Sequence, residues 1–140
     1  MMVGRLSEPR LIQIPHFGDE RGVLSVIDWE DSLPFVPKRF YYILNTHDGV
    51  KRGKHAHWEE GEVVLALSGS FTVLADDGTS ETTYRLDRPD AALYIPPMIW
   101  HELYEFSADA VCAVFASERF NIKDYCCDYE QFLRARRQQS

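Results

Sequence analysis

The chain has 140 residues, with 15 Lys and Arg against 22 Asp and Glu, and a formal net charge of -7 at pH 7. This acidic balance disfavours broad electrostatic binding to nucleic acid or to an anionic membrane, so local arginines must meet any anionic ligand. Hydrophobic residues make up 45% of the chain, without the long apolar run of a membrane span. We therefore expect one domain, residues 1–140, with a substantial core.

The start of the chain and its cysteines predict a cytoplasmic protein. Residues 1–8 lack the apolar region of a signal peptide. The three cysteines, Cys112, Cys126 and Cys127, form no CxxC pair and resemble the reduced thiols of cytosolic proteins. Cys112 lies in an apolar run, where a buried and inert thiol is the expected interpretation.

Short β-type runs recur along the chain, separated by residues that favour turns. We expect strands at 11–14, 22–29, 39–45, 54–57, 62–68, 70–75, 79–86, 92–95, 100–106 and 111–116. Residues 128–137 place Tyr129, Phe132 and Leu133 at helical spacing, with arginines near the end, and predict a C-terminal helix. This pattern predicts an all-β fold, and the need to protect strand edges favours a double-sheet jelly roll with a pocket in its bore.

His55 and His57 are the most informative pair in the chain. Side chains alternate along a strand, so the two imidazoles share one face and one small space. Histidine has an unperturbed pKa near neutrality, so such a pair can move protons or hold a metal. The spacing from Gly49 through His55-x-His57 and Glu62 to Gly69 resembles the first signature of the cupin jelly rolls.

Nearly the whole chain resembles one branch of the cupins, the dTDP-4-keto-6-deoxyglucose 3,4-ketoisomerases. The blocks that carry the resemblance, in order, are residues 19–22, 37–43, 52–57, 67–70, 93–97, 100–102, 124–125 and 128–130. The resemblance implies a cupin-type double-stranded β-helix with a short C-terminal helix. It also implies isomerisation of a dTDP-sugar without a metal or redox cofactor, and a homodimer whose N-terminal strand crosses to the partner.

The resemblance implies that a histidine moves a proton between C3 and C4 of the sugar through an enediol. We predict that His57 is the base and His55 its partner, and the reverse assignment stays open. The face from which C4 is protonated decides whether the product belongs to the galactose or the glucose series. The sequence does not fix that face.

Tyr41 and Tyr42 are adjacent, so only one of them can face the bore. Alternation groups Arg39, Tyr41 and Ile43 on one face and puts Tyr42 on the other. The pattern does not decide which face lines the site, because a barrel strand carries apolar residues on both. We favour Tyr42 as a proton donor or a hydrogen-bonding partner of the sugar.

Arg21, Arg39 and Arg52 are the candidate contacts of a nucleotide diphosphate, because a guanidinium fits phosphate oxygens in bidentate fashion. The default interpretation of each is a solvated surface charge. The resemblance raises Arg21 and Arg52 above that default, whereas Arg39 also has a structural interpretation. Alternation puts Arg52 opposite the histidines unless the strand begins at Gly53 or a bulge intervenes.

His101 is predicted to line the substrate site, and a metal site is the alternative. The family often has glutamine where this chain has Glu62. A carboxylate there restores the metal set that the cupins commonly use, here His55, His57, Glu62 and His101, which suits a divalent transition metal. A metal-dependent cupin enzyme, such as a dioxygenase, and a non-catalytic sugar-nucleotide-binding cupin therefore remain alternative functions.

Overall fold

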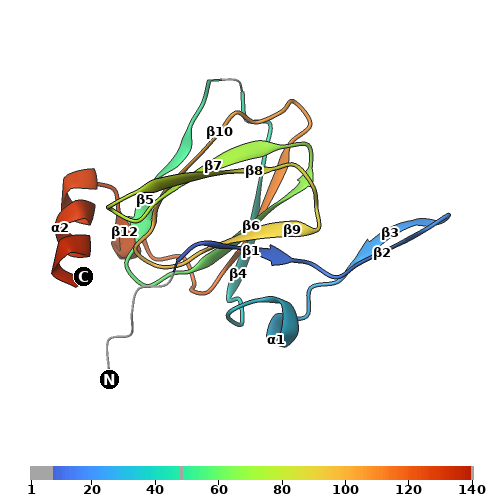
Figure 1. Ribbon diagram of the computed structural model, residues 1–140, viewed down its shortest axis with the longest axis horizontal. Coiled ribbons are helices and arrows are strands. Elements are labelled where there is room, and N and C mark those ends of the chain that lie inside the picture. Colours follow the sequence, from blue (N-terminus) through green and yellow to red (C-terminus); the bar gives the residue numbers. More distant parts are fainter. Residues whose placement is uncertain (1–7, 48, 140) are drawn as a thin grey trace.

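The computed structural model describes residues 8–47 and 49–139 (Figure 1). Residues 1–7, on which most of the expectation about a signal peptide rests, lie outside the described part. The elements are β1 (Arg10–Gln13), β2 (His16–Asp19), β3 (Gly22–Ser25), α1 (Trp29–Ser32), β4 (Arg39–Leu44), β5 (Arg52–His57), β6 (Glu62–Ser68), β7 (Phe71–Asp76), β8 (Glu81–Leu86), β9 (Ala91–Ile95), β10 (Trp100–Tyr104), β11 (Val111–Ala116), η1 (Ile122–Asp124), β12 (Tyr125–Cys126) and α2 (Tyr129–Gln139).

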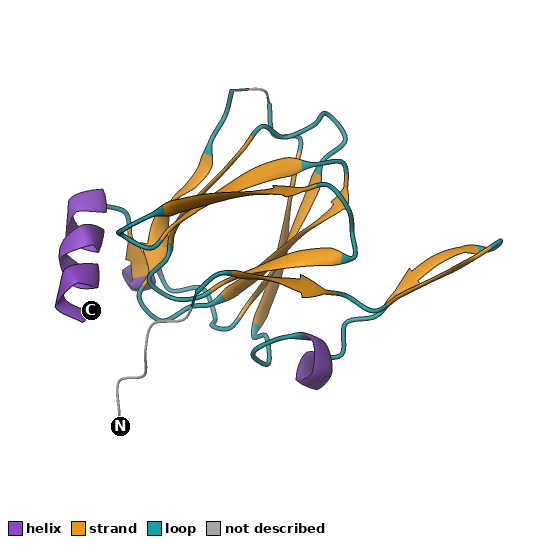
Figure 2. Ribbon diagram, viewed as in Figure 1, coloured by secondary structure: helices purple, strands orange, loops and turns teal. Residues whose placement is uncertain are grey.

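Two five-stranded sheets form the body of the molecule (Figure 2). The strand orders are β1-β9-β6-β11-β4 in the first sheet and β12-β5-β10-β7-β8 in the second. All the pairings are antiparallel. The predicted all-β jelly roll with a C-terminal helix is therefore confirmed, and most predicted strands agree with the observed ones to within two residues at each end.

The main core fills the space between the two sheets. Val64, Leu93 and Val114 reach it from the first sheet, and Phe71 and Val73 reach it from the second, all almost fully buried. These residues alternate with outward-facing ones along their strands, as side chains do on a pleated sheet. Burial of such side chains contributes about 1.5–3 kcal/mol each to stability.

Helix α2 packs on the outer face of the second sheet. Asp128 begins the helix, since its Oδ1 accepts hydrogen bonds from the backbone N–H groups of Glu130 (3.0 Å) and Gln131 (3.3 Å). Phe132 is fully buried against Trp100. The helix thus covers the outer side of the strands that carry the histidines.

The expected strand at 22–29 is only partly correct. It ends at Ser25 and pairs with β2, so the two strands form a separate hairpin, β2-β3. The chain then turns, and Asp28 precedes the short helix α1. The hairpin was missed because the β2 sequence, His16 to Asp19, carries only one large apolar residue and lacks the alternation of a half-buried strand.

The β2-β3 hairpin projects away from the two sheets (Figure 1). Every residue of β2 and β3 is exposed, including Phe17, Val23 and Leu24. By contrast, β1 pairs with β9 of the same chain, from Arg10 opposite Tyr94 to Gln13 opposite Ala91. Within residues 8–47 and 49–139, no helix has both the length and the apolar character needed to cross a membrane.

Candidate active site

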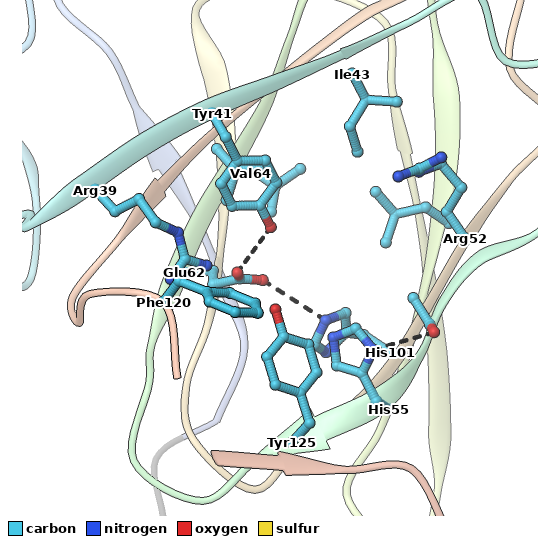
Figure 3. A pocket seen from close by; sticks show the side chains of 13 residues that line it. Arg39, Tyr41, Ile43, Arg52, His55, Glu62, Val64, His101, Phe120 and Tyr125 are labelled. Carbon is cyan, nitrogen blue, oxygen red and sulfur yellow. Dashed lines mark hydrogen bonds and ion pairs between the residues drawn. The ribbon is translucent and has the colours of Figure 1, made fainter. Parts of the chain in front are cut away.

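A cavity of about 380 Å³ opens between the two sheets, on the side where β4, β5 and β12 meet (Figure 3). It is lined by Arg39, Tyr41, Ile43, Arg52, Gly53, His55, Glu62, Val64, His101, Leu103, Val114, Phe120 and Tyr125. One part of the wall is apolar, formed by Ile43, Val64, Leu103 and Val114. The rest carries imidazole, carboxylate, hydroxyl and guanidinium groups, so the cavity suits a ligand that is both polar and partly apolar.

His55 reaches the cavity from β5 with one ring nitrogen engaged. Its Nδ1 lies 3.0 Å from the backbone oxygen of Gly53. A carbonyl oxygen can only accept, so Nδ1 carries the proton and Nε2 keeps a free lone pair. Burial, followed by the charge of His101, lowers the pKa of His55 to about 4. The neutral imidazole is therefore a proton acceptor at pH 7.

His57 lies behind the wall of the cavity and is not among its lining residues. Only 3% of its surface is exposed. Its Nε2 lies 3.5 Å from Oε2 of Glu60 and 3.8 Å from Oε2 of Glu62, and its Nδ1 lies 3.4 Å from Oδ2 of Asp124. Neither ring nitrogen has a hydrogen-bond partner among the described residues. Burial is the main cause that lowers the pKa of His57 to about 3.

Glu62 is the centre of the polar wall. Tyr41 donates a hydrogen bond of 2.8 Å from its hydroxyl to Oε2 of Glu62, and Nε2 of His101 lies 3.6 Å from Oε1. Nδ1 of His101 donates to the backbone oxygen of Ile99 at 3.1 Å. Burial acts to raise the pKa of Glu62, but His101 and hydrogen bonds from Glu60 and Tyr41 outweigh it and lower the pKa.

Arg39 lines the cavity but is held by a carboxylate. Its NH1 and NH2 each lie 3.2 Å from an oxygen of the buried Glu60, and its guanidinium lies 5.3 Å from the centre of the Tyr41 ring. Burial and the neighbouring Glu62 raise the pKa of Glu60 to about 9, although Arg39 opposes that shift. The pair Arg39 and Glu60 therefore supports the structural interpretation of Arg39.

The structure places Tyr41, not Tyr42, in the cavity. Along β4 the burial alternates strictly, and Tyr42 is 61% exposed on the outer face. The prediction that Tyr42 faces the bore is therefore wrong, because Tyr42 lies on the opposite face of β4. Burial, together with Glu62, raises the pKa of Tyr41 far above its ordinary value, so this hydroxyl stays protonated and can donate. The sequence did not decide which tyrosine faces the cavity, because both faces of β4 carry aromatic residues.

Arg52 shares the cavity with His55 because β5 contains a bulge. Gly53 has a φ of 82° and Lys54 a φ of 62°. The register with β10 shifts at this point, from His55 opposite His101 to Gly53 opposite Glu102, so Lys54 is the extra residue. The guanidinium of Arg52 forms no ion pair with any carboxylate of residues 8–47 and 49–139.

Arg21 lies at the turn of the β2-β3 hairpin and does not line the cavity of its own chain. Its side chain is 86% exposed and contacts Asp19 at 2.6 Å. The hydrogen bond with Arg21 lowers the pKa of Asp19. The structure thus brings together His55, Glu62, His101, Arg39 and Arg52, and leaves Arg21 apart.

Three residues of the segment after β11 were not singled out as site residues by sequence reasoning. Phe120 is 63% exposed and lines the cavity. The Tyr125 ring packs 4.8 Å from the ring of His55 and 4.5 Å from the ring of His57, with its hydroxyl directed into the cavity (Figure 3). Asp124 contacts His57. The only available signal was the Asp124-Tyr125 block of the family resemblance.

The donor set also fits a divalent transition metal. His55, His57 and His101 each offer one ring nitrogen, and these atoms lie within 4.8 Å of one another. Glu62 adds a carboxylate beside two of them. A bound metal would supply Lewis-acid polarisation of a substrate oxygen. The free ring nitrogens of His57 are consistent with such a ligand set.

Comparisons with known proteins agree with this geometry. The family described as "FdtA: WxcM-like, C-terminal" matches residues 7–137. The TDP-4-oxo-6-deoxy-alpha-D-glucose-3,4-oxoisomerase of Aneurinibacillus thermoaerophilus is 38% identical over 127 residues, which cover 91% of each chain. Two solved structures are also similar. A 3,4-ketoisomerase of Helicobacter canadensis has a TM-score of 0.89 at 33% identity and covers 93% of this chain and 98% of its own.

The second solved structure is QdtA, a sugar 3,4-ketoisomerase of Thermoanaerobacterium thermosaccharolyticum in complex with TDP. It has a TM-score of 0.90 at 30% identity and covers 93% of this chain and 95% of its own. The family match spans nearly the whole chain, and the relatives are sugar 3,4-ketoisomerases along nearly their full length. The chain therefore belongs to the FdtA family of sugar 3,4-ketoisomerases, and it is an isomerase.

Proposed function

We propose that this protein converts dTDP-4-dehydro-6-deoxy-D-glucose into a dTDP-3-dehydro-6-deoxy sugar, of the galactose or the glucose series, for deoxyamino-sugar biosynthesis. The named relative at 38% identity acts on a TDP-4-oxo-6-deoxyglucose. A variant of QdtA at 29% identity and a TM-score of 0.91 was solved with TDP-4-keto-6-deoxyglucose. The observation that carries the proposal in this chain is the free Nε2 of His55, facing a cavity with a protonated tyrosine and a carboxylate.

The carbon-bound proton is assigned to His55. The C3 proton lies next to the C4 ketone and is acidified by it, so a neutral imidazole can remove it as a general base. The same imidazolium then returns the proton to C4. The sequence predicted His57 as this base. The free Nε2 of His55 and its position in the cavity wall favour His55 instead, and His57 is its buried neighbour.

The oxygen-bound protons are assigned to Tyr41, with Glu62 as its hydrogen-bond partner. As the C3 proton leaves, the C4 oxygen gains a proton from the Tyr41 hydroxyl, which gives an enediol. The C3 hydroxyl then loses its proton to Tyr41, whose hydrogen bond to Glu62 keeps it oriented. One carbon is oxidised and its neighbour is reduced, so electrons balance within the sugar and the reaction needs no external oxidant or reductant.

Arg52 is the proposed contact of the diphosphate, with His101 beside the sugar. Arg52 is exposed at the rim of the cavity and has no carboxylate partner in the described chain. A guanidinium in that state is free to bind phosphate oxygens in bidentate fashion. Arg39 is a weaker candidate for this role, because Glu60 already engages both of its terminal nitrogens.

A homodimer is the proposed assembly, and the β2-β3 hairpin is the element that best supports it. A two-stranded ribbon is marginal in water without something to pack against. Here Phe17, Val23 and Leu24 are exposed on it, and the outer face of β4 is also exposed and apolar, at Phe40 and Leu44. A second copy would cover both surfaces. It would also place Arg21 of one chain near the cavity of the other, whereas Arg21 does not line the cavity of its own chain. The expected exchange of the N-terminal strand remains part of this proposal.

The proposed setting is a single-domain cytoplasmic enzyme. One core is shared by the two sheets of the described residues. Cys112, Cys126 and Cys127 are all free thiols, the state that a reducing compartment maintains. Burial raises the pKa of Cys112 to about 12, which supports its interpretation as an inert packing residue.

A metal-dependent cupin is the second candidate, favoured by the three histidine nitrogens that lie within 4.8 Å of one another. Its test is the metal content of the purified protein together with turnover before and after chelation. Stoichiometric metal with turnover lost on chelation would favour the metal enzyme. Full turnover after chelation would favour the acid–base isomerase.

The main proposal is tested by NMR of the protein with dTDP-4-dehydro-6-deoxyglucose in deuterated buffer. The expected result is a 3-keto product, with its C4 configuration read from proton couplings. Transfer by His55 within the active site predicts that part of the C3 proton reappears at C4. Unchanged substrate, or a 4-keto sugar with exchange at both C3 and C5, would overturn the proposal in favour of a binding protein or an epimerase.

A further inference from the structure

Asp124 contacts His57 from the side opposite to Glu60 and Glu62. Its Oδ2 lies 3.4 Å from Nδ1 of His57, whereas Nε2 of His57 faces Oε2 of Glu60 at 3.5 Å and Oε2 of Glu62 at 3.8 Å. The imidazole therefore lies between two groups of carboxyl oxygens. Sequence reasoning gave Asp124 no role.

The carboxylate of Asp124 is itself fixed by the backbone. Its Oδ1 accepts from the N–H of Glu59 at 2.8 Å, and its Oδ2 accepts from the N–H of Glu60 at 3.1 Å. Its side chain is only 11% exposed. An acceptor held in this way offers His57 a fixed direction for an N–H donor.

The two sides of the imidazole differ in how far their acceptors are already engaged by side chains. On the side of Nε2, Oε2 of Glu60 accepts from NH2 of Arg39, and Oε2 of Glu62 accepts from the Tyr41 hydroxyl. On the side of Nδ1, Oδ2 of Asp124 accepts only from the backbone N–H of Glu60 among the described residues. A neutral imidazole has one N–H, so the matching arrangement puts the proton on Nδ1 and the lone pair on Nε2.

We propose that Asp124 is a positioning residue of the active site, whose carboxylate holds the His57 ring in the orientation and tautomer with the proton on Nδ1. This inference rests on the proposed isomerase function for its catalytic meaning. The two groups are 3.4 Å apart and form no hydrogen bond in this structure, and catalytic hydrogen bonds are often long before substrate binds.

The orientation of the His57 ring affects the neighbouring groups that face the proposed substrate site. Its ring lies 4.8 Å from the ring of His55, edge to face, and 4.5 Å from the ring of Tyr125. Its Nε2 approaches the same oxygen of Glu62 that accepts the Tyr41 hydroxyl. A rotated His57 would therefore disturb both the proposed base and the proposed hydroxyl donor.

Asp124 also has a structural role that the test must separate. Its backbone oxygen accepts from the N–H of Trp58 at 3.0 Å, and its side chain holds Glu59 and Glu60. Loss of these bonds could lower stability alone. Asp124→Asn is the suitable variant, since its amide oxygen can still accept from the N–H of Glu59, whereas its amide nitrogen can accept neither from the N–H of Glu60 nor from His57.

The first measurement is the ¹⁵N NMR spectrum of histidine-labelled, metal-analysed wild-type protein at pH 7, with the His57 signals assigned by comparison with His57→Gln. The expected result is the neutral tautomer with the proton on Nδ1. A neutral tautomer protonated on Nε2, or a His57 protonated on both nitrogens, would overturn the inference. This measurement needs no substrate, so it stands or fails independently of the proposed function, which wild-type turnover tests.

The second measurement is the kinetics of Asp124→Asn beside Asp90→Asn. Asp90 is a buried carboxylate outside the cavity that contacts Arg88 and Gln13, so it controls for a general loss of stability. We expect Asp124→Asn to lower kcat by about 10²- to 10⁴-fold, with little change in KM and a loss of the Nδ1–H signal of His57. Wild-type kcat in Asp124→Asn, or an unchanged His57 spectrum, would overturn the inference. If that variant does not fold, the wild-type spectrum decides.

Discussion

Strands β4 and β5 line the same cavity but present their side chains in different ways. Along β4, Arg39 and Tyr41 face inward and Tyr42 faces solvent, as regular alternation requires. Along β5, positive φ values at Gly53 and Lys54 interrupt the alternation, so Arg52 and His55 line one cavity although they are three residues apart. A regular strand directs only every second side chain to the cavity, whereas a bulge lets side chains at other spacings reach it.

The two tyrosines of β4 provide the test with the largest expected effect. We expect Tyr41→Phe to lower kcat by about 10²- to 10⁴-fold, because it removes the proposed hydroxyl donor without changing the ring. Tyr42→Phe is the matched control on the outer face and should leave kcat within about twofold. Steady-state kinetics with the dTDP-sugar check both. Equal losses in the two variants would contradict the assignment by face.

The two cations of β5 provide the next test. Arg52→Met should raise KM for the dTDP-sugar, and Kd for dTDP, by about 10- to 100-fold, the scale of a lost hydrogen bond to a charged group. Lys54→Met removes a neighbouring exposed charge that does not line the cavity. Calorimetric titration with dTDP compares the two. If Lys54→Met weakened binding as much, a general electrostatic attraction would explain the data instead.

The bulge itself is tested by Gly53→Ala. Gly53 has a φ of 82°, and an added Cβ would lie 3.0 Å from the backbone oxygen of His101. We expect a loss of about 1–2 kcal/mol in the free energy of unfolding, because a side chain disfavours the left-handed region. Urea denaturation measures this loss. Gly18→Ala in the hairpin is a suitable control, since its added Cβ would make only an ordinary contact of 3.5 Å with Val23.

The smallest expected effect is a nearly flat pH profile between pH 8 and 6. The pKa of His55 is lowered to about 4, so this base stays neutral over the whole range and becomes protonated only as the pH falls towards 4. An ordinary histidine with a pKa of about 6.5 would be only about one quarter neutral at pH 6. The pH dependence of kcat/KM, with circular dichroism to confirm folding, distinguishes the two. A loss of about threefold between pH 7 and 6, as an ordinary histidine would show, would contradict the proposal.

Acid should also weaken the fold through the same histidines. A histidine with a lowered pKa binds fewer protons in the folded than in the unfolded state between its two pKa values. Stability is therefore lost as the pH falls from about 6.5 towards the lowered values of about 4 for His55 and about 3 for His57. Urea midpoints at pH 7 and 5 measure this change, and His55→Asn should reduce the difference between them.

Much of the fold followed from the sequence because its strands are strongly patterned. Residues 62–68 and 111–116 were predicted with the bounds that the structure gives to β6 and β11. Their apolar runs form part of the buried middle of the first sheet. The β2-β3 hairpin has no comparable signal, since its apolar residues are not buried in this chain and its second strand was extended too far, to residue 29.

The site residues that could be predicted are those of uncommon residue types at a characteristic spacing. His55, Glu62 and His101 were found because histidines and a carboxylate at cupin spacing rarely occur together outside a functional site. Tyr41 and Tyr42 could not be separated, since which face of a strand points inward depends on how the strand lies in the sheet. Tyr125 and Asp124 come from a segment that pairs with β5 through the short strand β12, which is too short to show a strand pattern in the sequence.

The peptide oxygen of Gly53 gives the bulge a further consequence. This oxygen accepts the Nδ1 proton of His55, and it belongs to the bulge that brings Arg52 to the same cavity. The tautomer of His55, the proposed base, and the direction of Arg52, the proposed anion-binding residue, therefore both depend on this bulge. Natural variation at this position should change ligand affinity and proton transfer together, so an engineer who wishes to alter one without the other would have to begin elsewhere.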